Sequence, residues 1–339
     1  MHGSATLLAF RGDHLETEHA ASVAVVAPDG ALRFSAGDPR RETPLRSTAK
    51  PFQAHALFAS GAVERFGLTT EEIALACASH EASPRHVALA AGLLRRIGLG
   101  PEALRCGAHE PGDERARHAL VLAREPFTAL HNNCSGKHAG MLAAALAFGA
   151  AAEDYLEHDH PVQRAVRAAH EALSGVPRLP WVIDGCSAPC AVMSVARLAR
   201  MYAQLAAPAA APTALAPGLA AAFDAMRAHP DLVAGESVPD TLLMRALPGV
   251  VAKRGADGAY ALALRETPHG PLGVAVKVHD GSGEARTALV VAVLDALGVT
   301  AGVEAALAPL REPRRLNWRG TVVGRWEVRL SLAAAPPAA

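Results

Sequence analysis

The sequence predicts an α+β fold in which segments from both ends of the chain share one antiparallel sheet. Apolar runs of strand length occur within the first 36 residues and again after residue 250. Between them, from residue 47 to about residue 235, the pattern is mostly helical. The composition, 50% hydrophobic and 19% charged, is that of a globular chain. Strands at both ends with helices between them are the order of an α+β fold.

The first strands are expected to form a hairpin. Residues 22–27 and 31–35 are apolar runs, and Pro28-Asp29-Gly30 between them suits a tight turn. Helix starts are indicated by proline or by the capping-box spacing of Thr69 and Glu72. The further expected strands are residues 181–184, 250–253, 259–265, 273–279 and 321–330, and the expected helices include 84–97, 161–173 and 284–297.

We expect one domain, residues 1–331, followed by a C-terminal tail at 332–339. The 339 residues are ample for one domain with a sizeable core. Its sheet lobe is expected at about residues 1–46 and 240–331, and its mainly helical lobe at about 47–239.

Charge and hydropathy exclude two classes of partner. Lys plus Arg and Asp plus Glu both number 33, with no long run of one sign, so nucleic-acid binding is not expected. No apolar stretch approaches the ~20 residues of a membrane span, so a membrane protein is not expected either. The first residues lack the pattern of a secretory signal, which predicts a cytoplasmic protein. A small molecule is the expected partner.

The cysteines number five, and this odd count without a secretory signal argues against a disulfide framework. We expect thiols that are packed, reactive or bound to a metal. They are Cys77, Cys106, Cys134, Cys186 and Cys190.

Ser47 and Lys50 are the first candidates for chemistry. They lie three residues apart at the start of an expected helix, a spacing that places both side chains on one face. A serine hydroxyl becomes a nucleophile when a neighbouring base takes its proton, and a lysine can be that base. The alternative is a helix-capping serine followed by a solvated lysine.

Lys253 and Ser79 extend this candidate site. Lys253-Arg254-Gly255 ends an expected strand, and it is similar to the Lys-Thr-Gly strand that accompanies Ser-x-x-Lys in serine β-lactamases. Ser79 follows an apolar helix, where capping and turn formation are the alternative role. Beside Lys253, Ser79 would form a second Ser-Lys pair able to pass protons.

Two polar segments, residues 131–140 and 184–190, contain thiols. Zinc favours Cys and His ligands, and Cys134, His138 and Cys186 would meet that preference if the segments meet in space. There is no close Cys-x-x-Cys pair, so buried structural cysteines are one alternative. Cys134 with His138 as thiol nucleophile and base is another.

Five segments together carry a resemblance to a known family. They are Arg46-Ser47-Thr48-Ala49-Lys50-Pro51, Ser79-His80, Asn133-Cys134-Ser135-Gly136-Lys137-His138-Ala139-Gly140-Met141, Asp184-Gly185-Cys186 and Lys253-Arg254-Gly255-Ala256-Asp257-Gly258. In this order they resemble the rhizobial-type L-asparaginase II family, over about residues 5 to 330. The segment around Cys134 is the most specific of them.

The resemblance implies a fold similar to serine β-lactamases and glutaminases, a homodimer, and a bound Zn²⁺ ion. One of the implied zinc ligands is a lysine. Because only a neutral amine can coordinate a metal, the zinc ion would have to displace the proton of this lysine. By position, the resemblance implies catalytic roles for Ser47, Lys50, Ser79 and Lys253, zinc ligation by Cys134, Lys137 and Cys186, and substrate-binding or supporting roles for Arg46, His80, His138 and Asp184.

The expected function is hydrolysis of L-asparagine to L-aspartate and ammonia through an acyl-enzyme, with Lys50 deprotonating Ser47. One rival is a penicillin-recognising serine hydrolase, which would leave the segments around Cys134 and Cys186 unexplained. Another is a zinc-stabilised protein that binds a small amide without turning it over.

Overall fold

The protein is described from a computed structural model, over residues 3–311 and 313–334. The chain divides into two compact units, and each is described by itself. Unit 1 comprises Met1–Thr48, Val192–Ala211 and Leu242–Ala339, and unit 2 comprises Ala49–Ala191 and Pro212–Thr241.

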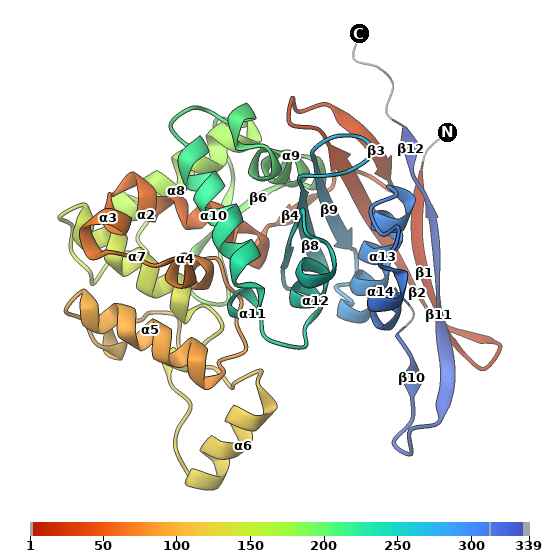
Figure 1. Ribbon diagram of the computed structural model, residues 1–339, viewed down its shortest axis with the longest axis horizontal. Helices are drawn as coiled ribbons and strands as arrows, with labels where there is room; N and C mark the ends of the chain where they lie inside the picture. Colours follow the sequence, from red (N-terminus) through yellow and green to blue (C-terminus); the bar gives the residue numbers. More distant parts are fainter. Residues whose placement is uncertain (1–2, 312, 335–339) are drawn as a thin grey trace. The chain divides into compact units, whose positions relative to one another are not determined.

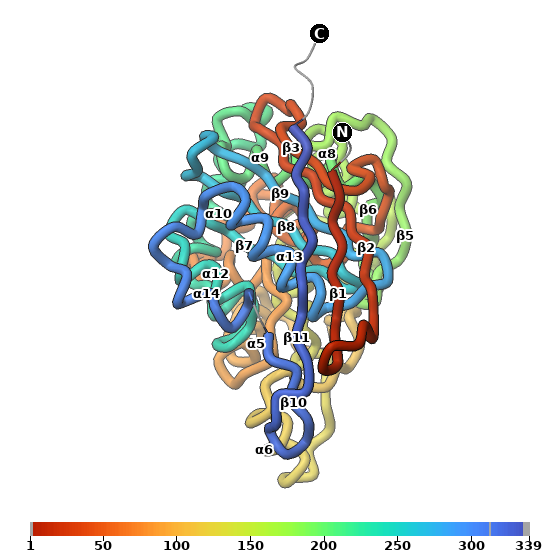
Figure 2. Tube along the Cα trace, turned by 90° about the vertical axis from the view of Figure 1, so that its right-hand side faces the viewer, coloured from red at the N-terminus to blue at the C-terminus, as the bar shows by residue number. Residues whose placement is uncertain are grey.

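Unit 1 is built on an antiparallel sheet that joins strands from the two ends of the chain. β1 (Ser4–Arg11) pairs with β11 (Val322–Ser331) along its whole length, and Leu7 lies opposite Val328. Figure 2 shows these two strands running side by side with β2. The strand order is β10-β11-β1-β2-β9-β8-β7, and β3 pairs with both β2 and β12. The other strands are β2 (His14–Val26), β3 (Leu32–Ala36), β7 (Val250–Arg254), β8 (Ala259–Leu264), β9 (Leu272–Val278), β10 (Arg315–Leu316) and β12 (Ala333–Ala334).

Helix α9 (Val195–Ala206) packs on one face of this sheet, against β2, β8 and β9. The contact is very close at Gly273 of β9, where a Cβ atom would lie 1.9 Å from the carbonyl oxygen of Ala199. Only glycine therefore fits at this point. Helix α13 (Gly283–Ala296) contacts β1, β8, β9 and β11, and α14 (Glu304–Arg311) packs against α13 (Figure 1). The short strand β4 (Glu42–Pro44) pairs with residues 192–194.

Unit 2 is mainly helical (Figure 1). Its centre is α7 (Ser135–Ala147), which contacts α2, α3, α4, α5 and α8. β5 (Trp181–Ile183) pairs with residues 189–191 of β6 (Pro189–Ser194). The remaining helices are α1 (Lys50–Gln53), α2 (His55–Ala59), α3 (Ala62–Phe66), α4 (Thr70–Ala76), α5 (Pro84–Arg96), α6 (Glu114–Ala123), α8 (Pro161–Ser174), α10 (Ala216–Ala228) and α11 (Pro230–Val233), with α12 (Pro239–Ala246) crossing into unit 1.

These elements confirm the α+β fold class and the sheet shared by both ends of the chain. The hairpin around Pro28 is present, and the capping box at Thr69 and Glu72 opens α4 as expected. Residues 335–339, most of the predicted C-terminal tail, lie outside the described residues, whereas β12 forms within its first part. Within the described part of the chain, no helix is long and apolar enough to cross a membrane.

Candidate active site

Ser47 and Lys50 occupy the short helical turns that follow β4. Ser47 lies in the 3₁₀ turn Arg46–Ala49, and Lys50 is the first residue of α1. The capping alternative for Ser47 is wrong at α1, because Ala49 occupies the N-cap position and makes no side-chain hydrogen bond there. The unit boundary falls between Thr48 and Ala49, so the Ser47–Lys50 pair stays a prediction.

Within unit 2, Lys50 is hydrogen-bonded to Ser79. Its side chain is buried, 1% exposed, and Nζ donates to Oγ of Ser79 at 2.9 Å. Nζ also donates to the carbonyl oxygens of Ala78, at 2.5 Å, and Asn133, at 3.2 Å. These acceptors match the three N–H groups of an ammonium. To act as a base, Lys50 must lose a proton and give up one of these hydrogen bonds.

Ser79 is held by its backbone on two sides. It lies just after the C-terminus of α4, and its N–H donates to the carbonyl of Val233 at the end of α11, at 2.9 Å. The next residue, His80, donates its backbone N–H to the carbonyl of Asn133 at 3.3 Å. Two separate segments of unit 2 therefore fix the position of the serine hydroxyl.

His80 is a buried, neutral side chain beside this serine. Nδ1 accepts the backbone N–H of Ala82, so Nε2 carries the proton and donates to Oγ of Ser135 at 2.9 Å. The ring stacks on that of His86, with centroids 4.9 Å apart. Burial first, and then the nearby His86 and Lys50, lower the pKa of His80 well below its ordinary value.

The predicted zinc ligands Cys134, Lys137 and Cys186 lie together in unit 2 and are buried. Nζ of Lys137 lies 2.9 Å from Sγ of Cys186. Cys134 and Cys186 share a hydrogen bond, which holds the pKa of Cys134 well below its ordinary value and raises that of Cys186. The charge of Lys50 also contributes to the lowered pKa of Cys134.

The charge state of Lys137 follows from these thiols. Burial alone would lower its pKa, but the neighbouring Cys186 and Cys134 more than offset burial, and the pKa is raised. Lys137 therefore holds its proton more tightly than an ordinary lysine. A metal ion would take the place of the lysine proton.

His138 and Asp184 flank the thiol group. Nδ1 of His138 lies 2.6 Å from the hydroxyl of Tyr155, whose oxygen also accepts the backbone N–H of Arg105. Burial first, and then the Lys137 charge, lower the pKa of His138 to about 4, so its ring is neutral. Asp184 begins the turn that carries Cys186, and its charge acts on Lys137.

Glycine makes the approach of these segments possible. A Cβ on Gly136, in the first turn of α7, would lie 2.4 Å from Cγ of Leu75 and 2.5 Å from its carbonyl oxygen. A Cβ on Gly140, one turn further along, would lie 3.2 Å from Cβ of Ala76. α7 and α4 therefore pack backbone against backbone, which brings Cys134 and Lys137 close to the segment after α4 that carries Ser79.

In unit 1, Lys253 lies on β7 and is buried. Its Nζ donates to the carbonyl oxygen of Arg254 at 3.0 Å. Arg46, next to Ser47, forms an ion pair with Asp257 in the turn after β7. Lys253 and Ser79 belong to different units, so their pairing stays a prediction.

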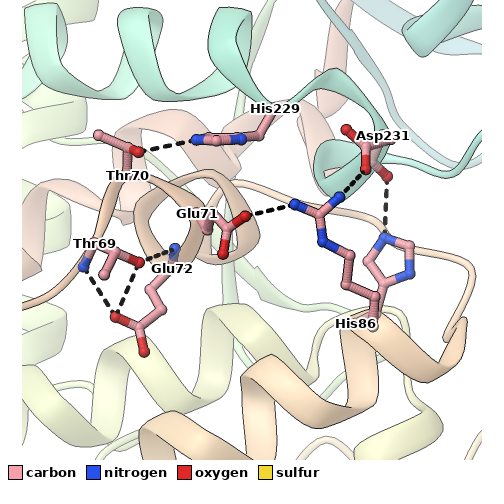
Figure 3. Close-up of polar contacts among 8 residues, drawn as sticks. Thr69, Thr70, Glu71, Glu72, His86, His229 and Asp231 are labelled. Carbon is pink, nitrogen blue, oxygen red and sulfur yellow. Dashed lines mark hydrogen bonds and ion pairs between the residues drawn. The ribbon is translucent and has the colours of Figure 1, made fainter.

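A polar network that the sequence did not indicate joins α5 to α11 (Figure 3). The carboxylate of Asp231 accepts from Arg85 at 2.6 Å, and the backbone carbonyl of Asp231 accepts from Nε2 of His86 at 3.0 Å. Arg85 also binds Glu71 at 2.5 Å. The network borders a cavity of about 160 Å³ lined by Glu81, Ser83, Arg85, His86, Asp113, Asp231, Leu232, Gly235 and Glu236.

The family comparison covers nearly the whole chain. The model of the L-asparaginase II family matches residues 8–328. The chain belongs to the L-asparaginase II family. As a member of this family it is an amidohydrolase with a small-molecule substrate, which confirms the expected enzyme class.

Similar solved structures include a Bacillus glutaminase, at 14% identity and a TM-score of 0.40, covering 83% of this chain and 92% of that one. They also include a β-lactamase from Mycobacterium bovis, at 16% identity and a TM-score of 0.39, covering 82% of this chain and 94% of that one. The comparison with curated proteins gave no match.

The donor set of this asparaginase-family chain fits a zinc ion. The sulfur atoms of Cys134 and Cys186 converge with the amine of Lys137, and cysteine sulfur is a ligand that zinc favours. Among the described residues no three His, Cys, Asp or Glu side chains form a metal-binding group by themselves. A zinc ion held here would therefore need Lys137 as a ligand.

Proposed function

We propose that the protein hydrolyses L-asparagine to L-aspartate and ammonia. The observation that carries this proposal is the 2.9 Å hydrogen bond from the buried Lys50 to Ser79, beside Cys134. A serine hydroxyl bonded to a buried lysine is a proton-transfer pair that acyl transfer to a nearby serine can use. Family membership supports a side-chain amide as the bond that is broken.

In the proposed mechanism, neutral Lys50 takes the proton of Ser47 while Oγ attacks the amide carbon of asparagine. The C–N bond then breaks, the nitrogen takes the proton from Lys50, and ammonia leaves a β-aspartyl ester on Ser47. Water attacks the ester, giving a proton to Lys50 that returns to Oγ as aspartate leaves. One asparagine and one water give one aspartate and one ammonia.

Ser79 and Lys253 are proposed to move protons rather than to attack. The hydrogen bond between Lys50 and Ser79 supports this role, because a proton taken by Nζ can be passed on through that hydroxyl. His80 is proposed to hold the segment that carries Ser79, through its hydrogen bond to Ser135.

Cys134, Lys137 and Cys186 are proposed to hold a zinc ion, and a bound zinc would supply Lewis-acid polarisation of an amide oxygen. We further propose that Arg46, His138 and Asp184 bind substrate or support these ligands. A homodimer is proposed from the family resemblance, and a cytoplasmic location is proposed beside it.

The proposal is tested by ammonia release from asparagine and from glutamine, with and without added zinc. We expect wild type to release ammonia from asparagine. Ser47→Ala and Cys134→Ala are compared with Ser331→Ala, which alters an exposed serine at the end of β11. Ser47→Ala should be inactive and Ser331→Ala unchanged.

Mass spectrometry of an acid-quenched reaction identifies the nucleophile. A β-aspartyl adduct is expected on the peptide that contains Ser47. An adduct on Ser79 would assign attack to that serine and reverse the two roles. Hydrolysis of a chromogenic β-lactam without ammonia from asparagine would overturn the proposed substrate.

A further inference from the structure

Lysine is rare in this chain. Lys plus Arg number 33, and only the residues at positions 50, 137, 253 and 277 are lysines, so 33 − 4 = 29 are arginines. Three of the four lysines are the site residues Lys50, Lys137 and Lys253. At positions where a positive charge serves only solubility, the chain uses arginine. Lys277, the fourth lysine, is therefore a candidate for a specific role, because the two cations are not interchangeable at a geometrically defined site.

Lys277 lies on the same face of the sheet as Lys253. On β8, Ala261 is opposite Lys253 and Ala259 is opposite Lys277. Residues two apart on a strand project to the same face, so both lysine side chains lie on the face that Ala259 and Ala261 share. Gly273, four residues before Lys277 on β9, contacts α9 from this same face.

The turn after β7 brings Lys277 and Arg46 to one residue. Nζ of Lys277 donates to the backbone carbonyl of Asp257, and the guanidinium of Arg46 binds the carboxylate of Asp257. A Cβ on Gly255, in the same turn, would lie 3.2 Å from Thr48 and 3.3 Å from the carbonyl of Leu45. The turn therefore packs directly against the segment that contains Ser47.

Backbone strain is concentrated in this pair. Arg46 has a φ of 52° and Asp257 a φ of 53°, both in the left-handed region that residues other than glycine rarely adopt. Such conformations cluster at functional sites. Two strained residues that face each other beside Ser47 indicate that their side chains are held in place for binding.

Positive charge is in excess here. Burial first, and then the charges of Arg41 and Arg46, lower the pKa of Lys277, and only the carboxylate of Asp280 raises it. The Asp257 side chain, which is paired with Arg46, is 68% exposed. An exposed carboxylate on a cluster of cations is readily exchanged for the carboxylate of a ligand.

We propose that Lys277, together with Arg46, binds the α-carboxylate of the amino-acid amide, in place of the Asp257 carboxylate. Lys277 is then a specificity-determining residue: it selects amides that carry a carboxylate and takes no part in proton transfer. This inference rests on the proposed function, and it defines which part of the substrate lies against unit 1.

The test compares two substrates on three proteins. L-asparagine carries the α-carboxylate, and 3-aminopropanamide is the same amide without it. For Lys277→Met, we expect KM for asparagine to rise roughly 10-fold or more, with kcat within about 2-fold, because a charge-assisted contact is lost. The rate constant kcat/KM for 3-aminopropanamide should be unchanged. Lys277→Arg, which keeps the charge, should give a KM for asparagine between those of wild type and Lys277→Met.

The controls separate this inference from the proposed function. Arg329→Met removes an exposed cation from β11 of the same sheet and should leave both substrates unaffected. If wild type releases no ammonia from asparagine, the proposed function fails. If wild type is active and Lys277→Met leaves KM for asparagine unchanged, the inference alone fails. An equal loss with both substrates would also overturn it, because that is the result of a structural role in the turn.

Discussion

The two groups of lysines lie in contrasting surroundings. In unit 2, Lys50 and Lys137 are 1% and 3% exposed and contact a serine hydroxyl and thiols. In unit 1, Lys277 is half-buried and binds a turn whose Asp257 side chain is 68% exposed. A buried lysine bonded to a serine hydroxyl can exchange protons with that fixed neighbour, whereas a half-exposed lysine lies where a ligand can reach it. From this difference we propose proton transfer at Lys50 and substrate recognition at Lys277.

The largest effect is expected from substituting Lys50, and it tests whether Lys50 and Lys277 have different roles. Lys50→Met keeps the length of the side chain but removes the donor to Ser79 and any base for Ser47. We expect kcat for asparagine to fall by at least roughly 100-fold, the lower end of general acid–base contributions. Lys277→Met should affect KM instead. If kcat of Lys50→Met stays within tenfold of wild type, with far-UV circular dichroism unchanged, the division of roles is wrong.

The second prediction concerns His170, a buried histidine in the helical core of unit 2. It makes the free energy of unfolding depend on pH. His170 is fully buried between Phe52 and Trp181, and Nδ1 donates to the carbonyl of Val166. Burial lowers its pKa from 6.5 to about 4. Since the folded pKa lies below the unfolded one, the unfolded chain binds the extra proton between these values, and stability is lost as pH falls from 6.5 to 4.

The expected loss from His170 is about 3 kcal/mol of unfolding free energy over this window, at about 1.4 kcal/mol per pKa unit. His170→Asn, whose amide can replace the donor to Val166, should show a flatter dependence in urea unfolding at pH 4 to 7. The exposed His118→Asn is the matched control and should follow wild type. Identical slopes for wild type and His170→Asn would contradict this account.

The next smaller effect is expected where α7 packs closely against α4, beneath the site. Gly136→Ala places a methyl group against the backbone of Leu75, and we expect a loss of about 1–3 kcal/mol of unfolding free energy, as for other overpacked contacts. Activity should fall with it, because α7 and α4 separate. Gly92→Ala, inside α5 with only a distant Arg95 atom nearby, is the control. It should be neutral or stabilising by up to about 1 kcal/mol. Equal effects of the two changes would sink the packing argument.

This contact also shows how far sequence reasoning reaches. The hairpin, the strands after residue 250 and the helices starting at Pro84 and Pro161 follow from local periodicity and proline, and the structure has them at nearly the expected bounds. The hydrogen bond between Lys50 and Ser79 was not predicted, because it joins the start of α1 to the segment after α4, 29 residues further along the chain. The four-residue spacing of Gly136 and Gly140 was the available signal for the close packing of α4 against α7.

In the candidate site, too, some residues are close because they are near in sequence and others only because of the fold. Cys134 and Lys137 are one helical turn apart, so their proximity is local, whereas Cys186 joins them from a turn 49 residues beyond Lys137. Family resemblance, not spacing, placed these three together. Lys277 was missed because it lies within an apolar strand pattern. Because lysine is scarce in the sequence, Lys277 could have been singled out without any structure.

The smallest expected effect concerns Asp231, which supports the catalytic segment from a distance. Asp231 holds Arg85 and His86 of α5 (Figure 3). The same helix α11 accepts the backbone N–H of Ser79 through the carbonyl of Val233. Asp231→Asn keeps the carbonyl that His86 uses and removes only the charge that Arg85 binds. Since Arg85 is half-exposed, the ion pair contributes no more than about 1 kcal/mol.

We therefore expect Asp231→Asn to lower kcat for asparagine about 3-fold while KM stays the same, because Ser79 shifts and the recognition group in unit 1 does not. Asp13→Asn, at a fully exposed carboxylate in the turn between β1 and β2, should leave both constants unchanged. Steady-state kinetics of the two variants measures the difference. A rise in KM with kcat unchanged would place Asp231 with recognition and remove the contrast between the units, since substrate binding would then depend on both.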